Sequence, residues 1–262
     1  MPVQLMGVLN VTPDSFSDGG RYFPLDSALQ QARHLIDDGA SILDIGGEST
    51  RPGAESVSTA EELRRVLPVI EAIRHESAIR LSIDTMKPEV ADAALRAGAT
   101  LINDVTGLRD PAMIAVAARH HAGVVIMHMR GTPQTMRGLT EYADLVAEVK
   151  AHLAAQAAAA RAAGITELIL DPGLGFAKTA AQNFTLLRRL DEFEELGYPI
   201  LIGPSRKSFL SSISDLERPE DRLEGTLAAV AIGVLHGATF IRAHDVAACR
   251  KAALVAAAVR TS

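Results

Sequence analysis

Four side chains with carboxylate or amide groups come at the ends of short apolar segments of this chain. They are Asn10, Asp84, Asn103 and Asp171. Gathered where water is excluded, such groups suit a flat heterocycle with an amino-pyrimidinone edge, because the N–H groups of that edge need acceptors. Three of them, together with Asp44, could instead cap the helices that follow. The four in combination favour a binding site.

Eight such apolar segments alternate with helix-like stretches along the whole chain. They cover residues 4–10, 41–45, 79–84, 100–104, 123–128, 167–171, 199–203 and 238–242. Each is rich in Val, Ile or Leu with almost no alternation, which is typical of parallel strands buried on both faces. Eight strand–helix units in 262 residues match a closed (β/α)₈ TIM barrel, which typically needs about 250 residues. We therefore expect one α/β domain over residues 1–262, with its active site at the carboxyl ends of the strands.

Local signals mark the ends of the helices. Thr59 and Glu62 have the spacing of a capping box that would open the second helix, and Pro88 and Pro111 stand where prolines start helices. Glycines in the positions expected for helix C-caps precede six of the segments. They are Gly39, Gly98, Gly123, Gly164, Gly197 and Gly237.

Cations follow the last two apolar segments. Arg206 and Lys207 come after the seventh, and Arg242 ends the eighth. The seventh and eighth loops of such barrels often bind phosphate, so we expect an anion there. Two alternatives remain open at this point: Arg206 could lie on a solvated surface, and Lys207 and Arg242 could form structural ion pairs with Asp171 or Asp245.

The loops after the first two strands are long. Residues 11–25 and 46–58 are richer in Gly, Pro, Ser and Thr than a compact loop of about 2–6 residues requires. Loops of this length are often lids over a site, and we expect both to be mobile.

Composition excludes several classes of function. A formal charge of −6 argues against binding duplex nucleic acid, which needs a basic face. No apolar stretch approaches the ~20 residues of a membrane span, and residues 1–6 lack a signal-peptide pattern. Cys249, the only cysteine, cannot form an internal disulfide and is expected to pack inside the last helix. We expect a cytoplasmic protein with small-molecule partners, and neither nucleic acid nor membrane among them.

The loop and strand-end residues carry a family resemblance. The segment NVTPDSFSDGG begins at Asn10, and DIGGESTRPG begins at Asp44. With the residues at the later strand ends, they closely resemble the dihydropteroate synthases of folate biosynthesis. The matching residues are 10–20, 44–53, 82–85, 102–104, 127–129, 170–173, 205–208 and 241–245. The resemblance covers nearly the whole chain in the same order.

The resemblance implies an activity, a cofactor and an assembly. The family condenses 6-hydroxymethyl-7,8-dihydropterin diphosphate with p-aminobenzoate and releases 7,8-dihydropteroate and pyrophosphate. The resemblance also implies that the protein binds Mg²⁺ through Asn10 and forms a homodimer. Loss of diphosphate has SN1-like character, and the carboxylate of Asp84 stabilises the positive charge left on the pterin methylene.

Site residues carry over position by position. The implied pterin-binding residues are Asp84, Asn103, Met127, Asp171, Gly203 and Lys207. The implied diphosphate-binding residues are Asn10, Thr50, Arg51, Arg242 and His244. The implied p-aminobenzoate pocket comprises Phe16, Pro52, Phe176, Ser205 and Lys207. The implied catalytic residues are Asp84, Lys207, Arg242 and His244.

Three positions depart from the family pattern and put the shape of the pocket in question. Leu174 stands where the family often has Phe, Ala177 where it often has Gly, and Pro204 where Met is common.

Three other functions would account for parts of the sequence. The pterin domain of methyltetrahydrofolate corrinoid methyltransferases shares the barrel and the Asp/Asn cradle, but it has no need for a diphosphate site or for the first two loops. A non-catalytic pterin-binding paralogue is disfavoured because Asp84, Lys207 and Arg242 are all present. A Schiff-base aldolase using Lys207 leaves the first two loops unexplained.

Overall fold

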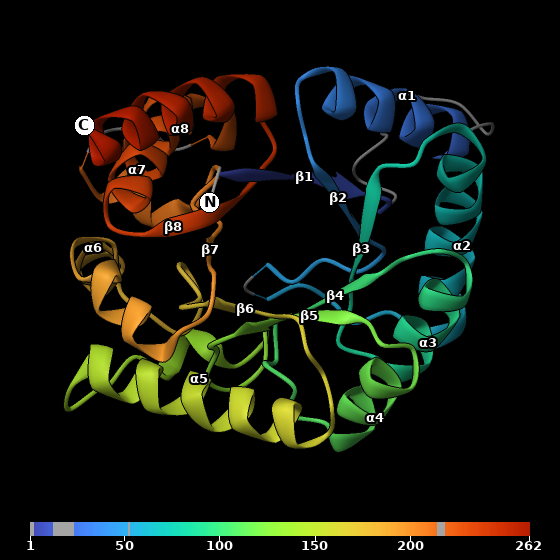
Figure 1. Ribbon diagram of the computed structural model, residues 1–262, viewed down its shortest axis with the longest axis horizontal. Helices are drawn as coiled ribbons and strands as arrows, with labels where there is room; N and C mark the ends of the chain where they lie inside the picture. The colour runs from blue at the N-terminus through green and yellow to red at the C-terminus, as the bar shows by residue number, and fades with distance from the viewer. Residues whose placement is uncertain (1–2, 13–23, 52, 214–217) are drawn as a thin grey trace.

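Eight parallel strands close into a barrel in chain order, with β1 paired to β8. The computed structural model describes residues 3–12, 24–51, 53–213 and 218–262. Figure 1 looks along the barrel and shows the strands inside a ring of helices. The strands are β1 (Gln4–Asn10), β2 (Ile42–Gly46), β3 (Arg80–Asp84), β4 (Leu101–Asp104), β5 (Gly123–Met127), β6 (Leu168–Asp171), β7 (Ile200–Ile202) and β8 (Ala238–Ala243). Each lies within or overlaps a predicted segment, so the predicted (β/α)₈ fold is confirmed.

Helices alternate with the strands and cover the outside of the barrel. They are α1 (Pro24–Asp37), α2 (Thr59–Glu76), α3 (Pro88–Arg96), α4 (Pro111–Arg119), α5 (Leu145–Ala162), α6 (Ala180–Arg188), α7 (Leu223–Leu235) and α8 (Val246–Thr261). Short 3₁₀ turns lie at Met136–Gly138, Leu190–Leu196, Ser208–Ile213 and Pro219–Arg222. Within the described ranges, no helix combines the length and apolar character of a membrane span.

The strands bury both of their faces, and this alternation places the site. A small apolar cluster fills the barrel interior with one side chain from each strand except β3. Its members are Met6, Ile42, Leu101, Val125, Ile169, Leu201 and Phe240. On each of these strands, apolar residues next to the cluster member point outward and join a larger core that packs against the helices. Because side chains in a strand alternate with period two, the position two residues beyond each cluster member again faces inward. These next positions include Asp44, Asn103, Met127, Asp171, Gly203 and Arg242.

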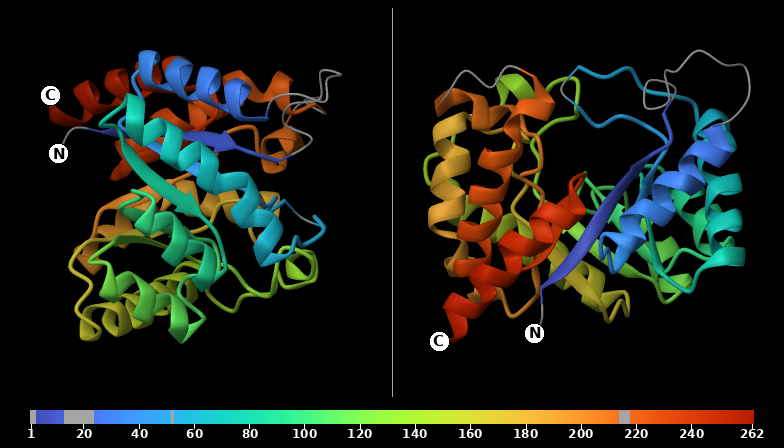
Figure 2. Two further views of the ribbon diagram at one scale, coloured as in Figure 1. Left: turned by 90° about the vertical axis from the view of Figure 1, so that its right-hand side faces the viewer. Right: turned by 90° about the horizontal axis from the view of Figure 1, so that it is seen from above.

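The two ends of the barrel differ. Figure 2 shows the start of β1 and the end of α8 at one end, and the loop between β2 and α2 at the other. The carboxyl ends of all eight strands therefore meet at the end that carries this long loop.

The helix-end predictions were right in part. Pro88 and Pro111 open α3 and α4 as predicted. The predicted capping box of Thr59 and Glu62 is wrong: Ser58 is the N-cap of α2, and its hydroxyl accepts a hydrogen bond from the Glu61 amide at 3.2 Å. The side chain of Glu62 is turned inward and fully buried instead.

Five of the six predicted cap glycines adopt positive φ, between 74° and 116°. Gly123 does not, so that prediction is wrong. It is the first residue of β5, and the positive φ in this connection belongs to His121, at 51°. Cys249 is buried in α8, as predicted, and burial raises the pKa of its thiol to about 12.

Candidate active site

One guanidinium is held between two carboxylates inside the mouth of the barrel. Arg242 donates from Nε to Asp44 Oδ2 and from Nη2 to Asp84 Oδ2, both at 2.6 Å. Asn103 Nδ2 donates to the same Asp44 oxygen at 2.9 Å. The four residues come from β8, β2, β3 and β4, and the two aspartates and the asparagine are almost completely buried. The alternative that Arg242 pairs with Asp171 or Asp245 is thus wrong, and Asp44, which was read only as a possible cap, is a central member of the cluster.

The pKa values of Asp84 and Arg242 in this cluster are shifted from their ordinary values. Burial raises the pKa of Asp84 to about 7, with Arg242 opposing the shift and Asp44 adding to it. Burial acts against the charge of Arg242, but Asp44 and Asp84 outweigh it and raise the pKa of the guanidinium. Asp44 Oδ1 and Asp84 Oδ1 are buried and have no hydrogen-bond partner within the described chain. Because buried acceptors are normally satisfied, these two oxygens are free to accept hydrogen bonds from a bound ligand.

Lys207 stands beside this cluster, next to the loop after β6. Its Nζ donates to the Leu174 carbonyl and lies 4.4 Å from the centre of the Phe176 ring, a cation–π distance. Burial lowers the pKa of Lys207 to about 8, while the charge of Asp171 opposes the shift. The ammonium therefore loses its proton at a pH only slightly above neutral.

Asp171 shapes the turn that follows β6. Its Oδ1 accepts the Gly173 amide at 2.7 Å, and burial raises the pKa of its carboxyl. Gly173 has φ of 73°, and a Cβ there would lie 2.0 Å from the His128 carbonyl oxygen. Only glycine fits this close approach, so the turn sets where Leu174 and Phe176 meet Lys207.

His244 is oriented by Ser205 across the seventh and eighth loops. Ser205 Oγ lies 3.0 Å from His244 Nδ1 and accepts the backbone amide of His244 at 3.1 Å. Burial lowers the pKa of His244 to about 3, and the charge of Arg242 acts in the same direction. A neutral ring that accepts the Ser205 hydroxyl proton at Nδ1 carries its own proton on Nε2. His244 can therefore donate to an anion.

Arg206 is an ion-paired residue and not a free surface cation. Its guanidinium forms two hydrogen bonds to Asp245, at 2.9 and 2.6 Å. Its backbone has φ of 58°, and its amide donates to Thr226 Oγ1 at 3.0 Å. This pairing commits Asp245 to Arg206 and leaves Lys207 directed toward the β6 loop.

A buried lysine that sequence reasoning missed supports the same loop. Lys178 Nζ contacts His128 Nδ1 and the Gly173 carbonyl at 3.0 Å and the Phe176 carbonyl at 2.9 Å. Burial lowers the pKa of Lys178 to about 7 and that of His128 to about 2. The only signal was its place at the end of the glycine-rich DPGLGFAK segment.

The positions that depart from the family pattern fit without removing a polar group. Leu174 is fully buried and supplies the carbonyl that Lys207 contacts. Ala177 adopts φ of 50°, which favours glycine, and its carbonyl accepts Tyr142 Oη at 3.0 Å. The Pro204 carbonyl accepts the Lys207 amide at 3.2 Å.

The remaining predicted residues lie around the same mouth. Asn10 ends β1 and is paired in register with Gly46. Met127 ends β5 and Gly203 directly follows β7, and both are buried. Thr50 and Arg51 lie in the loop after β2, half-buried and exposed respectively.

Two predicted residues cannot be placed. Phe16 and Pro52 lie outside the described residues, as does most of the first long loop. The predicted mobility of the two loops therefore stays a prediction.

The whole chain is similar to known pterin enzymes. Residues 6–244 match the family described as pterin binding enzyme. A dihydropteroate synthase of Synechocystis sp. is 51% identical, covering 97% of this chain and 89% of that protein. The Xanthomonas albilineans dihydropteroate synthase with 4-aminobenzoic acid superposes with a TM-score of 0.93 at 46% identity, covering 100% of this chain and 94% of that one. In complex with 7,8-dihydropteroate, the enzyme of that species gives a TM-score of 0.90 at 43% identity, covering 100% and 95%. This chain therefore belongs to the dihydropteroate synthases of the pterin-binding enzyme family.

Proposed function

We propose that the chain joins 6-hydroxymethyl-7,8-dihydropterin diphosphate to p-aminobenzoate, giving 7,8-dihydropteroate and pyrophosphate. The observation that carries the proposal is the buried cluster in which Arg242 bridges Asp44 and Asp84 while one oxygen of each carboxylate lacks a partner among the described residues. Those oxygens suit the N–H groups of a pterin, and the cations beside them suit its diphosphate. The 51% identity to a protein named dihydropteroate synthase favours this reaction over that of a corrinoid methyltransferase.

The pterin side of the site is assigned to residues at the strand ends. Asp84 Oδ1 and Asp44 Oδ1 would accept ring N–H groups, and Asn103 and Asp171 would complete the hydrogen-bonding edge. Met127 and Gly203, both buried, would line the slot, and Lys207 would close it. A rigid set of donors and acceptors of this kind binds a ligand without first having to be ordered.

Bond cleavage is assigned to the opposite charges on the two sides of the methylene group. As the bond between the pterin methylene carbon and the diphosphate oxygen breaks, the electron pair leaves with diphosphate. Arg242 and the Nε2–H of His244 would hold that anion, together with Thr50 and Arg51. The Asp84 carboxylate would stabilise the methylene cation. The amine of p-aminobenzoate then forms the C–N bond and loses a proton.

Magnesium fits this site as a companion of the diphosphate. Asn10 offers one neutral amide oxygen at the end of β1, and within the described ranges no three His, Cys, Asp or Glu side chains form a group that could hold a metal by themselves. This donor set matches Mg²⁺, which usually keeps several waters and binds through few protein ligands plus substrate phosphates. When bound, the ion would offset charge on the diphosphate oxygens.

The p-aminobenzoate pocket is assigned to Phe176, Ser205 and Lys207, with Phe16 and Pro52 completing it from the two long loops. The Phe176 ring is held against Lys207 and provides an apolar wall for the aromatic substrate. The Lys207 ammonium suits the substrate carboxylate. Ser205 contributes to the pocket by holding the His244 ring with its hydroxyl.

One assay tests the reaction against its rivals. The protein is incubated with the pterin diphosphate, p-aminobenzoate and Mg²⁺, and dihydropteroate and pyrophosphate are measured. We expect both products in equal amounts and their loss with EDTA. Binding of the pterin without product would indicate a non-catalytic paralogue, and trapping of Lys207 by borohydride would indicate a Schiff-base enzyme. Full activity after chelation would overturn the role given to Asn10.

The assembly is proposed to be a homodimer formed through α7 and α8. These neighbouring helices (Figure 1) expose large apolar side chains at five positions. They are Ile232, Leu235, Leu254, Val255 and Val259. Sedimentation analysis is expected to give a dimer, and Val255→Glu is expected to shift it to monomer. A monomeric wild type would refute the dimer. We further propose that the enzyme acts in the cytoplasm.

A further inference from the structure

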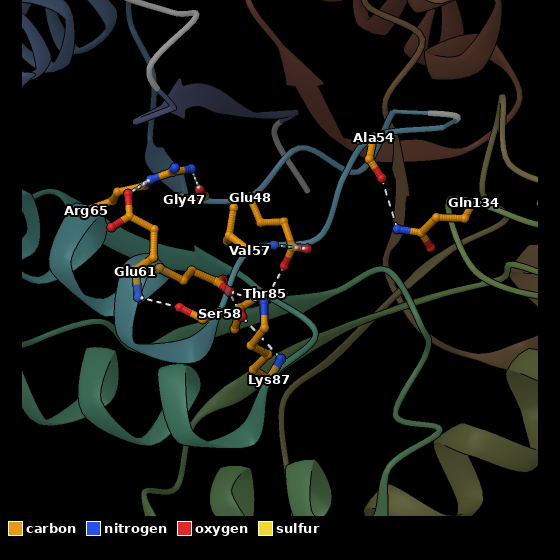
Figure 3. Close-up of polar contacts among 11 residues, drawn as sticks. Gly47, Glu48, Ala54, Val57, Ser58, Glu61, Arg65, Thr85, Lys87 and Gln134 are labelled. Atoms are coloured by element: carbon orange, nitrogen blue, oxygen red, sulfur yellow. Dashed lines mark hydrogen bonds and ion pairs between the residues drawn. The ribbon is translucent and has the colours of Figure 1, made fainter.

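A second group of buried charges lies under the loop after β2, outside the cluster around Arg242. Glu48 is near the start of this loop, Glu62 is in the first turn of α2, and Lys87 directly precedes α3. Lys87 Nζ donates to Glu48 Oε2 and, at 2.5 Å, to Glu62 Oε2. The side chains of the two glutamates are 4% and 0% exposed, and that of Lys87 is 21% exposed. Figure 3 shows Glu48, Thr85 and Lys87 gathered beneath the loop. We call Glu48, Glu62, Thr85 and Lys87 the Lys87 cluster.

All four carboxylate oxygens of this cluster are hydrogen-bonded. Besides the contacts to Lys87, Glu48 Oε1 accepts the Val57 amide at 3.2 Å, and Glu62 Oε1 accepts Thr85 Oγ1 at 2.6 Å. Burial would lower the pKa of Lys87, but its two glutamate partners outweigh burial and raise it, so the ammonium stays charged. A cluster with every acceptor satisfied is built to hold structure and not to bind a ligand.

The cluster joins both ends of the loop to the strand that ends in Asp84. Glu48 is near the start of the loop and Val57 near its end, so the Glu48 carboxylate ties the two together. Lys87 then connects this base to the chain three residues after Asp84. Residues Thr50 and Arg51 lie between the tied ends.

The tip of the same loop is attached elsewhere. The Gly53 amide donates to the Pro133 carbonyl at 3.1 Å, and Gln134 Nε2 donates to the Ala54 carbonyl at 3.0 Å. Figure 3 shows this contact well apart from the Lys87 cluster. Arg51 is therefore carried on a segment held at its base by buried charges and at its tip by hydrogen bonds.

We infer that Lys87 is a positioning residue for the transfer reaction, because its ammonium fixes the base of the loop that presents Thr50 and Arg51 to the diphosphate of a pterin bound at Asp84. The inference rests on the proposed function, which supplies the diphosphate. Lys87 acts through Arg51 and does not touch the substrate. Its main effect is on the diphosphate end of the ligand, because the strand ends hold the pterin ring.

Two ligands separate these ends in a titration experiment. Calorimetry measures the Kd of 6-hydroxymethyl-7,8-dihydropterin diphosphate with Mg²⁺ and the Kd of 6-hydroxymethyl-7,8-dihydropterin, which lacks the diphosphate. Lys87→Met is expected to weaken binding of the diphosphate ligand about tenfold and to change binding of the free pterin less than about twofold. Lys87→Arg, which can still reach two carboxylates, is expected to stay within about threefold of wild type for both.

A lysine of equal exposure serves as the matched control. Lys150 on α5 pairs with Glu195 at 2.7 Å, and its side chain is 20% exposed. Lys150→Met removes the same charge and fills a similar volume far from the loop in sequence, so neither Kd is expected to change by more than about twofold. If Lys87→Met fails to fold, Glu48→Gln replaces it, because that change leaves Lys87 paired with Glu62. We expect it to weaken binding of the diphosphate ligand about threefold.

A double-mutant cycle with Arg51 tests whether Lys87 acts on the ligand through Arg51. If Lys87 acts through Arg51, Lys87→Met changes the affinity for the diphosphate ligand less than about twofold in an Arg51→Ala background. Additive losses would overturn the inference, as would equal losses for the two pterins. A wild-type protein that binds both pterins but forms no dihydropteroate would refute the proposed function and leave the positioning role of Lys87 to be judged by these affinities.

Discussion

Two clusters in this protein each place two buried carboxylates around one cation, but they differ in how many of the carboxylate oxygens accept a hydrogen bond. In one, Arg242 is held by Asp44 and Asp84 inside the barrel mouth. In the other, Lys87 is held by Glu48 and Glu62 between the β2 loop and α2. Each sets two buried carboxylates against one cation. The Lys87 cluster satisfies all of its carboxylate oxygens, whereas the Arg242 cluster leaves Asp44 Oδ1 and Asp84 Oδ1 without partners in the described part of the chain.

This difference indicates that the Lys87 cluster supports the structure, whereas the Arg242 cluster belongs to the binding site. A buried acceptor without a partner costs roughly 1–3 kcal/mol, so two of them in one cluster are a substantial cost to the stability of the fold. Under the proposed function, these two oxygens serve as acceptors for the N–H groups of the pterin. A cluster without spare acceptors has only its attachments to offer, and those of Lys87 lead to the loop that carries Arg51.

The choice of cation follows the same division. The planar guanidinium of Arg242 fixes its two aspartates in a defined geometry, which suits a site that must present their remaining oxygens. The Lys87 ammonium is a compact charge on a flexible stem, and it only has to draw two glutamates together. Substitutions in the Arg242 cluster therefore test activity, and substitutions in the Lys87 cluster test stability and the position of the loop.

Asp84→Asn is expected to have the largest effect on activity. The change keeps the shape of the side chain but removes the charge that stabilises the methylene cation, so we expect kcat to fall about 100-fold or more. Steady-state rates of dihydropteroate formation measure it. Asp92→Asn, on α3, is the control, because Asp92 also pairs with two arginines but lies in the helix layer. Its kcat should stay within about threefold. An Asp84→Asn enzyme as active as this control would remove Asp84 from the chemistry.

Lys87→Met is expected to have the largest effect on stability. It leaves Glu48 and Glu62 buried without a cation. The loss of one partner from a buried ion pair is costly, so we expect the unfolding free energy to fall by about 3 kcal/mol. Lys150→Met removes an equally exposed ammonium from a single, largely exposed glutamate and should cost less than about 0.5 kcal/mol. Urea denaturation of the two variants gives the comparison. Equal losses would mean that the Lys87 cluster is no more than a surface pair.

The pH dependence of kcat/KM tests the perturbed groups of the Arg242 cluster and its neighbour. Asp84, with its pKa raised to about 7, must lose its proton to stabilise a cation, so the rate should rise up to that pH. Lys207, with its pKa lowered to about 8, must keep its proton, so the rate should fall above that pH. Each limb should approach about tenfold per pH unit. His244, with its pKa lowered to about 3, adds no limb in this range.

A single substitution assigns the falling limb. Lys207→Arg keeps the positive charge at high pH, so the decline above pH 8 should disappear even if the overall rate is lower. A decline that persists in this variant would assign the falling limb to another group.

The barrel and the strand-end residues could be predicted because their signals are local. Apolar segments of about five residues identify the strands, and the polar residues at or next to the end of each segment follow directly. Asp84, Asn103, Asp171 and Arg242 were placed at the mouth in this way, and the structure has them there.

Partners within the site could not be predicted, because they depend on the register of the closed barrel. Arg242 meets Asp44 and Asp84 across sequence separations of 198 and 158 residues. Asp44 stands near the end of a predicted strand but is interpreted only as a possible helix cap, because nothing in its local sequence shows that Arg242 lies beside it. In the same way, Glu62 has the spacing of a capping residue, but its carboxylate binds Lys87 and Thr85 instead.

The start of α2 gives the smallest expected effect and a direct check on that competition. Ser58 caps the helix through the Glu61 amide, so Ser58→Ala should lower the unfolding free energy by about 1 kcal/mol. Thr59→Ala should change it by less than about 0.5 kcal/mol, because Thr59 is the first helical residue and not the cap. Urea denaturation of both variants measures the difference. Were Thr59→Ala the more destabilising, Thr59 and Glu62 would form the capping box after all. Glu62 would then be drawn away from Lys87, and the contrast between a fully satisfied cluster and one with spare acceptors would fail.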